Sequence, residues 1–370
     1  MSAPPVPMGP STGGRAAGID FGRPQVVVRV GGYSQRLDRR AVLVGSLVAV
    51  LLVVAFVGGL VAGDDGVGLA KVPAGLFGGD QLAEFAIREL QLPRVLAAIV
   101  LGAAMALSGG IFQLLTRNPL GSPDLIGFGV GSYTGALIAS LLLGLGFAGM
   151  SLFALVGGLL TAAAVYLLAY RGGVGGFRLV ITGVALSAML AAVNYWLILR
   201  APNLDDAMLS AQWGAGTLDT PVARNWSYLW PAFAVVAVLA LALALLGPRT
   251  RVLDLGPDLA RAMGAQTRAG TIALPVIGVA LIAVATTIAG PVAFVALAAP
   301  HIARRLCRCG HTPWTVTALV GALLFLLGDI LAQRISAVVG GSLPVGVITV
   351  CVGGVYLCYL LFTEMRRARG

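Results

Sequence analysis

The sequence predicts an all-α polytopic membrane protein with ten transmembrane helices, and its composition carries that prediction. Hydrophobic residues make up 58% of the 370-residue chain and charged residues only 11%, whereas soluble domains contain about 25% charged residues. Apolar stretches of about 20 residues, the length that crosses a bilayer as a helix, recur along the chain. A water-soluble fold is therefore excluded.

Ten apolar segments are expected to form the transmembrane helices. They cover residues 41–62, 93–115, 124–145, 149–170, 179–199, 226–246, 270–289, 292–306, 314–333 and 344–363. The first residues are rich in Pro, Gly and Ala and lack an apolar segment, so residues 1–35 are expected to form a disordered cytoplasmic tail. Residues 36–370 then form the ten-helix transmembrane domain.

Two of these helices carry a local signal about packing. Segment 292–306 is short for a membrane span and follows Gly290-Pro291, so it is expected to begin below the membrane surface or to pack inside the protein. In the second helix, Gly102, Ala106 and Gly110 recur at helical spacing. Small residues in that pattern favour close packing against a neighbouring helix.

The charge pattern predicts the orientation in the membrane. Basic residues resist translocation, and with the amino terminus inside, the arginine-rich loops and both termini are cytoplasmic. The opposite loops are then acidic and carry Asp64, Asp65, Asp80, Glu84, Glu89, Asp205, Asp206 and Asp219. The formal charge of +10 is therefore explained by topology, and no nucleic-acid partner is expected.

The sequence offers no energy source for transport within the chain itself. It contains no GxxxxGK[ST] motif, and Lys71 is its only lysine, so a P-loop for nucleotide is absent. An ion-driven carrier would usually show carboxylates or histidines at midmembrane depth. Asp329 lies near the outer end of its helix, and Asp124 opens another, where it is expected to be an N-cap rather than a ligand. An ATPase-independent carrier is thus the weaker alternative.

No catalytic residues, metal site or cofactor are expected. The two histidines, His301 and His311, have no carboxylate close in sequence, which argues against a membrane-embedded enzyme. Cys307, Cys309 and His311 form a C-x-C-x-H cluster, but three ligands without a fourth are a weak metal signal. The chain is therefore interpreted as non-catalytic.

The polar break at 249–269 contains an amphipathic helix, which distinguishes it from the other cytoplasmic loops. Asp258 follows Pro257 in the expected first turn, where an acidic side chain suits the helix dipole, and Gly264 can end the helix. The apolar face is formed by Leu255, Leu259, Ala262 and Met263. Such a helix lies in the lipid interface or docks into a groove on a partner.

Three separated motifs resemble a known family. The segments TRNPLGSPDLIGF at 116–128, LDLGPDLARAMG at 253–264 and AGPVAFVALAAPHIARRL at 289–306 match, in order, signatures of the iron-siderophore and vitamin B12 (FecCD-type) ABC importer permeases. The resemblance covers residues from about 36 to 367. Within the family, the chain most resembles the second permease of ferric-enterobactin importers.

This resemblance implies the type II ABC importer permease fold and a set of partners. These are a cytoplasmic ABC ATPase dimer, a second related permease and an extracytoplasmic siderophore-binding lipoprotein, with a heterodimer of permeases favoured and a homodimer possible. The polar break becomes the coupling helix, about 254–264, which docks on the ATPase. The residues that inherit this role are Leu255, Gly256, Leu259, Ala260, Met263 and Gly264.

On the outer face, the resemblance implies docking of the binding protein through arginines. Arg94 in QLPR and Arg334 match that pattern, although Gln91 replaces the first arginine of the usual RLPR and Arg334 is displaced by one residue. Arg88, one helical turn before Gln91, is a candidate to compensate. The alternative is that Arg94 only anchors a helix end at the headgroups.

The resemblance also implies a cytoplasmic gate where the fifth helix begins, at Gly176 and Phe177. Phe177 is suited to closing a pore by dewetting, and the nearby glycines would let the loop move; a plain flexible connector explains the glycines equally well. Asn194 and Tyr195, in the same helix, are candidates to face the pathway. Hydrogen bonding between helices is an equal alternative.

The function implied is a transmembrane permease subunit that moves a ferric siderophore, of catecholate (enterobactin-like) or related type, across the cytoplasmic membrane of a bacterium. Heme or cobalamin is the main alternative cargo within the same family. ATP hydrolysis is expected to belong to the partner subunit.

Overall fold

The computed structural model describes residues 25–30, 33–63, 68–119, 121–169, 176–254 and 267–369. Each of the ten predicted apolar segments contains a helix in the described part, and the predicted all-α fold class is confirmed. The main helices are α1 (Arg39–Leu60), α4 (Leu92–Thr116), α5 (Phe128–Leu137) continued by η4 (Ile138–Leu142), α6 (Phe147–Ala169), α7 (Gly176–Leu199), α9 (Trp226–Asp254), α11 (Thr267–Ala289), α12 (Val295–Cys307), α13 (Trp314–Val339) and α14 (Val345–Arg369).

Short elements connect these helices. They are β1 (Gln25–Val30), β2 (Tyr33–Asp38), η1 (Leu69–Lys71), α2 (Val72–Phe77), α3 (Gln81–Phe85), η2 (Ala86–Gln91), η3 (Pro123–Ile126) and α8 (Leu204–Gly214). Six helices of the described chain are long and apolar enough to cross a membrane, and shorter apolar helices cover Phe128–Leu142, Ala273–Ala289 and Val345–Tyr359. The chain is thus built as a multi-pass membrane protein.

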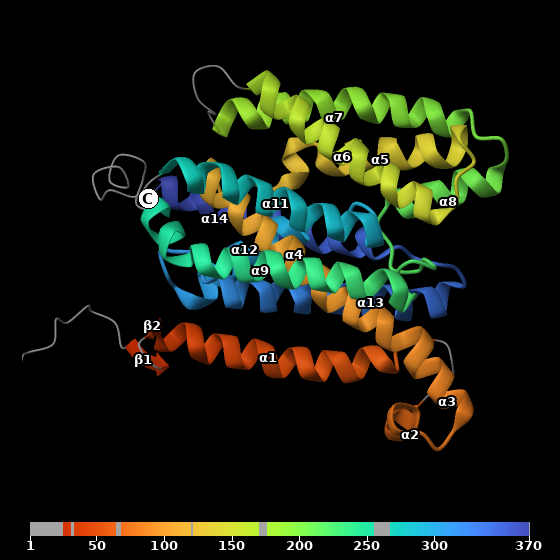
Figure 1. Cartoon of the computed structure of the whole chain (residues 1–370), viewed down its shortest axis with the longest axis horizontal. Helices are drawn as coiled ribbons and strands as arrows, with labels where there is room; N and C mark the ends of the chain where they lie inside the picture. Colours follow the sequence, from red (N-terminus) through yellow and green to blue (C-terminus); the bar gives the residue numbers. More distant parts are fainter. Residues whose placement is uncertain are drawn as a thin grey trace, which may run out of the picture.

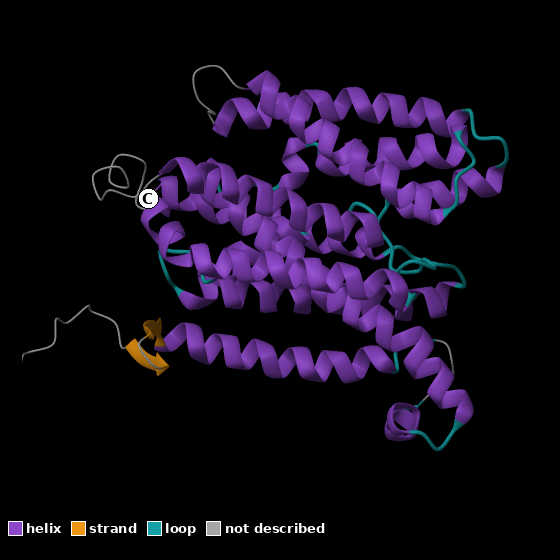
Figure 2. Ribbon diagram, viewed as in Figure 1, coloured by secondary structure: helices purple, strands orange, loops and turns teal. Residues whose placement is uncertain are grey.

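The helices run side by side along the long axis of the molecule (Figure 1). Helix α1 lies along one edge, α5, α6, α7 and α8 lie toward the opposite edge, and α4 passes through the middle. The β1–β2 hairpin and the C-terminus lie at the same end of the bundle, and α2 and α3 lie at the other end (Figure 1). Helix dominates the fold, as Figure 2 shows.

The β1–β2 hairpin differs from the expected disorder of residues 1–35. The two strands pair antiparallel, with Gln25 opposite Asp38 and Val30 opposite Tyr33; residues 1–24 lie outside the described part. Three consecutive valines in β1 favour an extended backbone because β-branched side chains restrict χ1. The Gly-Gly pair that separates the strands in the sequence is a hairpin signal, and composition alone hides it.

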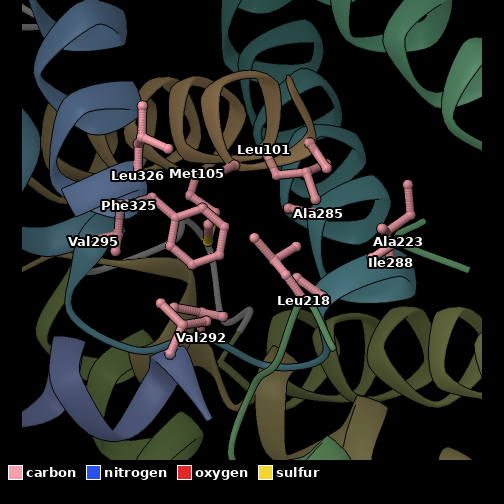
Figure 3. Close-up of a cluster of buried hydrophobic side chains, with 14 of the residues drawn as sticks. Leu101, Met105, Leu218, Ala223, Ala285, Ile288, Val292, Val295, Phe325 and Leu326 are labelled. Atoms are coloured by element: carbon pink, nitrogen blue, oxygen red, sulfur yellow. The ribbon is translucent and has the colours of Figure 1, made fainter. Parts of the chain in front are cut away.

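The core lies where α4, α11, α12 and α13 meet, together with the loop before α9. Phe325 of α13 occupies the middle of this cluster, with Met105, Val292 and Leu218 around it (Figure 3). All four side chains are buried. These contacts join segments far apart in the sequence into one packed unit.

Small residues let α4 approach its neighbours, as the sequence predicts. A Cβ placed on Gly102 would lie 2.6 Å from the Gly321 carbonyl oxygen of α13, and one on Gly321 would lie 2.3 Å from Cβ of Ala106. A Cβ on Gly109 would lie only 1.6 Å from the carbonyl oxygen of Ala296 in α12. Only glycine permits these backbone contacts.

Helix α12 is short and packed on its neighbours, which agrees with the prediction for segment 292–306. Its 13 residues span about 20 Å, less than the roughly 30 Å of a hydrocarbon core. Before it, the chain turns at Gly290 and Phe294, which have φ values of 71° and 70°. The Thr217 N–H donates to the Ala289 carbonyl oxygen at 2.7 Å, so the loop before α9 folds down onto this break. Irregular backbone is tolerated here because protein surrounds it.

Candidate transport pathway and docking sites

A buried ion pair joins α4 to α13 near the end of the bundle that carries α2 and α3. Arg94 donates from Nε to Asp329 Oδ2 at 3.0 Å and from Nη2 to Oδ1 at 2.9 Å. Gln333 adds a hydrogen bond from Nε2 to the same carboxylate at 2.8 Å. Arg94 is 7% exposed and Asp329 is 0% exposed. This two-point geometry fixes the guanidinium inside the protein.

An open polar pocket of about 400 Å³ lies beside this ion pair. Its lining includes Arg94 together with Asp219 and Arg224, which form a further ion pair. Asp219 also lies 3.7 Å from Nη1 of Arg94 and accepts a hydrogen bond from Ser342 at 3.0 Å. The charges of the pocket are thus largely balanced within the chain.

The three predicted docking arginines differ in accessibility. Arg334 is exposed and donates from Nη2 to the carbonyl oxygen of Val61 at 2.6 Å. Arg88 is partly exposed, pairs with Glu84 one turn earlier and donates to the carbonyl oxygen of Leu76 at 2.6 Å. Arg94 instead pairs with the buried Asp329, and its docking role stays a prediction.

The two pathway candidates in α7 point to different sides. Asn194 is 4% exposed, and its Nδ2 lies 3.4 Å from the Val130 carbonyl oxygen of α5, whereas Tyr195 is 67% exposed. For Asn194, the contact supports hydrogen bonding between helices, the alternative that the sequence left open. Gly176 and Phe177 form the first turn of α7 in the structure, and their side chains are outside the described part.

The predicted coupling residues lie outside the described residues, since the structure describes the chain up to Asp254 and again from Thr267. This applies to Leu255, Gly256, Leu259, Ala260, Met263 and Gly264. The flanking helices α9 and α11 are described and pack against each other, because Leu243 and Leu274 belong to one buried cluster. The two helices that flank the polar break therefore pack together.

Polar side chains gather around the C-terminal half of α12. His301 Nδ1 lies 2.6 Å from the Tyr356 hydroxyl of α14, and Arg304 hydrogen-bonds to Gln113 of α4. Cys309 donates its Sγ–H to the carbonyl oxygen of His311 at 3.2 Å. Within the described ranges, no group of three or more His, Cys, Asp or Glu side chains is placed to hold a metal ion.

Asp124 does not cap α5, whose N-cap is Gly127. Asp124 instead lies within the first turn of η3, whose N-cap is Ser122. The N-cap prediction was therefore wrong for the helix it named.

Comparison with known proteins identifies the family. A model of the FecCD transport family matches residues 51–363. The chain belongs to the FecCD transport family. This FecCD chain is 41% identical to the Escherichia coli K12 ferric enterobactin transport system permease protein FepG, over 90% of the chain and 99% of FepG. It is 33% identical to the permease FepD of the same organism, over 90% of the chain and 97% of FepD.

A solved structure shows the same fold. An inward-facing metal-chelate type ABC transporter matches the FecCD chain with a TM-score of 0.76 and 26% identity, over 87% of this chain and 99% of the transporter chain. The predicted type II ABC importer permease fold and the enterobactin-branch resemblance are thereby confirmed. FecCD proteins are permease subunits, so a multi-pass location in the membrane follows for this chain.

Proposed function

We propose that this FecCD chain is one of two transmembrane subunits of an ABC importer for ferric siderophores of the catecholate type. The observation that carries the proposal is the match to FepG, which extends over 99% of that permease at 41% identity. A match of that extent includes the helices of the pathway as well as the family motifs. The match to FepD supports a heterodimer of two related permeases.

The chain supplies a pathway, and the energy comes from a separate ATPase dimer. The sequence contains no P-loop motif, so nucleotide binding and hydrolysis are assigned to that partner. ATP-driven closure of the ATPase would move the coupling helix at about 254–264 and switch the side to which the pathway opens. Gly176 and Phe177, at the start of α7, are the proposed cytoplasmic gate.

Cargo delivery is assigned to the end of the bundle that carries α2 and α3. Arg334 is exposed there and Arg88 partly so, which makes them the proposed contacts for an extracytoplasmic siderophore-binding lipoprotein. Because the hairpin and the C-terminus lie at the opposite end (Figure 1), both termini are then cytoplasmic. This placement agrees with the basic loops of the sequence.

Uptake in iron-starved cells tests the cargo. The gene for this chain is deleted, and uptake of radiolabelled ferric enterobactin, heme and cobalamin is measured with and without the chain restored. We expect only the ferric siderophore signal to depend on the chain. Restoration of heme or cobalamin uptake, with ferric siderophore uptake unchanged, contradicts the proposed cargo.

A further inference from the structure

Three contacts fasten the cytoplasmic end of α9 to the turn between α12 and α13. Thr250 Oγ1 accepts a hydrogen bond from Trp314 Nε1 at 3.1 Å. One turn later, the Asp254 carboxylate lies close enough to the Thr312 N–H, His311 and Arg304 for these groups to lower its pKa. Leu253, between them, packs in the same apolar cluster as Trp314. We call Thr250, Asp254, Thr312 and Trp314 the α9–turn latch.

The two threonines of the latch are buried, Trp314 is partly buried and Asp254 is exposed. Thr250 is 1% exposed and Thr312 is 4% exposed. The Thr250 hydroxyl is fully used, since it also donates to the Gly247 carbonyl oxygen at 2.8 Å. Asp254 lies beyond the apolar part of α9, which ends at Gly247. Buried polar partners separate at a cost, so these elements tend to move together.

The charges around Asp254 favour the same arrangement. Asp254 is exposed, but partial desolvation at the end of α9 raises the pKa of its carboxyl, while the Thr312 N–H, His311 and Arg304 act in the opposite direction. Arg304 belongs to α12, so the carboxylate at the end of α9 also faces a cation on that helix. The exposed carboxylate is thus attracted by positive charge on the turn and on α12.

The turn directly follows α12, and α12 is itself held by contacts with α4 and α14. Arg304 hydrogen-bonds to Gln113 of α4, and Gln113 donates to the Leu297 carbonyl oxygen at 2.9 Å. At the far end of α12, a Cβ on Gly353 of α14 would lie 2.3 Å from Cβ of Phe294. A helix of 13 residues therefore connects the latch to a tightly packed point about 20 Å away.

We propose that the α9–turn latch transmits the movement of the cytoplasmic end of α9 to α12, and that Thr250, Asp254 and Trp314 are positioning residues for coupling. The inference rests on the proposed function, in which the chain that follows Asp254 docks on an ATPase. The latch then converts movement at the ATPase into a shift of the short helix α12 inside the bundle. No residue of the latch touches cargo or nucleotide.

Siderophore transported per ATP hydrolysed is the measurement that tests the latch, in proteoliposomes that contain the complete importer. Thr250→Val keeps the shape of the side chain and Trp314→Phe keeps a ring, while each removes the same hydrogen bond. We expect each variant to copurify with the ATPase, and to lose about fivefold in transport per ATP, the factor of one hydrogen bond. The double variant Thr250→Val/Trp314→Phe should lose no more transport per ATP than either single variant, because both substitutions remove the same hydrogen bond.

Two further variants separate coupling from folding. Asp254→Ala should lose coupling because it removes the charge that attracts Arg304, while Asp254→Glu, which keeps that charge, should recover part of it. Thr287→Val is the matched control, because the Thr287 hydroxyl donates only within α11, to Ala283 at 2.7 Å. Wild-type transport per ATP in Thr250→Val and Asp254→Ala overturns the latch. Absence of any ATP-dependent transport by the wild-type importer overturns the proposed function instead.

A distance measurement keeps the proposal testable if a latch variant fails to fold. Spin labels at Arg251→Cys on α9 and Arg308→Cys on the turn occupy exposed positions, with the exposed Cys351 and Cys358 replaced by Ser. We expect the same label-to-label distance in nucleotide-free and ATP-bound importer. A change of more than about 5 Å, one helical turn, means that α9 and the turn move separately and overturns the latch.

Discussion

Asp329→Asn is the change that most directly tests what Arg94 does in this chain. The substitution keeps the size of the side chain and removes only the negative charge, so no cavity is created. It leaves the guanidinium of Arg94, 7% exposed, without its buried counter-charge. Breaking a buried pair in this way costs about 3–5 kcal/mol. Asp219, 3.7 Å away but 38% exposed, offsets only part of that cost.

We therefore expect Asp329→Asn to lower the free energy of unfolding by about 3 kcal/mol. The assay is equilibrium unfolding of the purified chain in mixed detergent micelles, followed by tryptophan fluorescence. Asp219→Asn is the control, because the side chains of Asp219 and Arg224 are 38% and 34% exposed and pairs of that kind contribute about 0–1 kcal/mol. The double variant Arg94→Met/Asp329→Leu should recover most of the stability, since no charge is then left buried.

Two results would refute this reasoning. One is an Asp329→Asn variant within about 1 kcal/mol of wild type, the range of a surface pair. The other is an Arg94→Met/Asp329→Leu variant whose loss of unfolding free energy equals the sum of the losses in the two single variants. Such additivity means that the two residues do not interact. A docking role for Arg94 instead predicts weaker binding of the partner lipoprotein with unchanged stability.

The remaining predictions concern packing, coupling and docking. Gly102→Leu should cost about 3 kcal/mol or more, because its Cβ would meet the backbone of α13 at 2.6 Å; Gly58→Ala, with nothing within 4 Å of its Cβ, should leave the unfolding free energy unchanged or slightly higher. Leu259→Asp should abolish copurification with the ATPase while the bundle stays folded, and Leu259→Met should not; retained copurification contradicts the coupling assignment. Arg334→Ala should weaken binding of the siderophore-binding protein about tenfold, the factor of one charge-assisted hydrogen bond, with partial recovery in Arg334→Lys; equal affinities in a binding titration argue against that contact.

The order of the helices along the chain was predictable because each membrane helix is encoded by a long apolar segment. The ten segments, the break at Gly290-Pro291 and the close contact at Gly102 all follow from local composition. The hairpin was missed because its valines lie in a stretch dominated by small and polar residues. Sequence motifs, rather than periodicity, indicated the family.

The pairs of side chains that contact each other across the bundle could not be predicted from the sequence. Arg94 and Asp329 are 235 residues apart, and a carboxylate near a helix end gives no sign of its partner. Trp314 and Thr250 are 64 residues apart, and neither belongs to a sequence pattern that indicates a contact between them. Asn194 and Tyr195 were treated alike because adjacent residues of an apolar helix do not reveal which one faces the bundle.

ATP-dependent uptake of ferric enterobactin by the reconstituted importer is the most direct test of the central claim, that this chain forms one half of a pathway driven by a separate ATPase. Vesicles are prepared with both permeases and the binding protein, with or without the ATPase. The account predicts uptake only when the ATPase and ATP are both present, and none when this chain is omitted. Equal uptake in vesicles that lack the ATPase would contradict it.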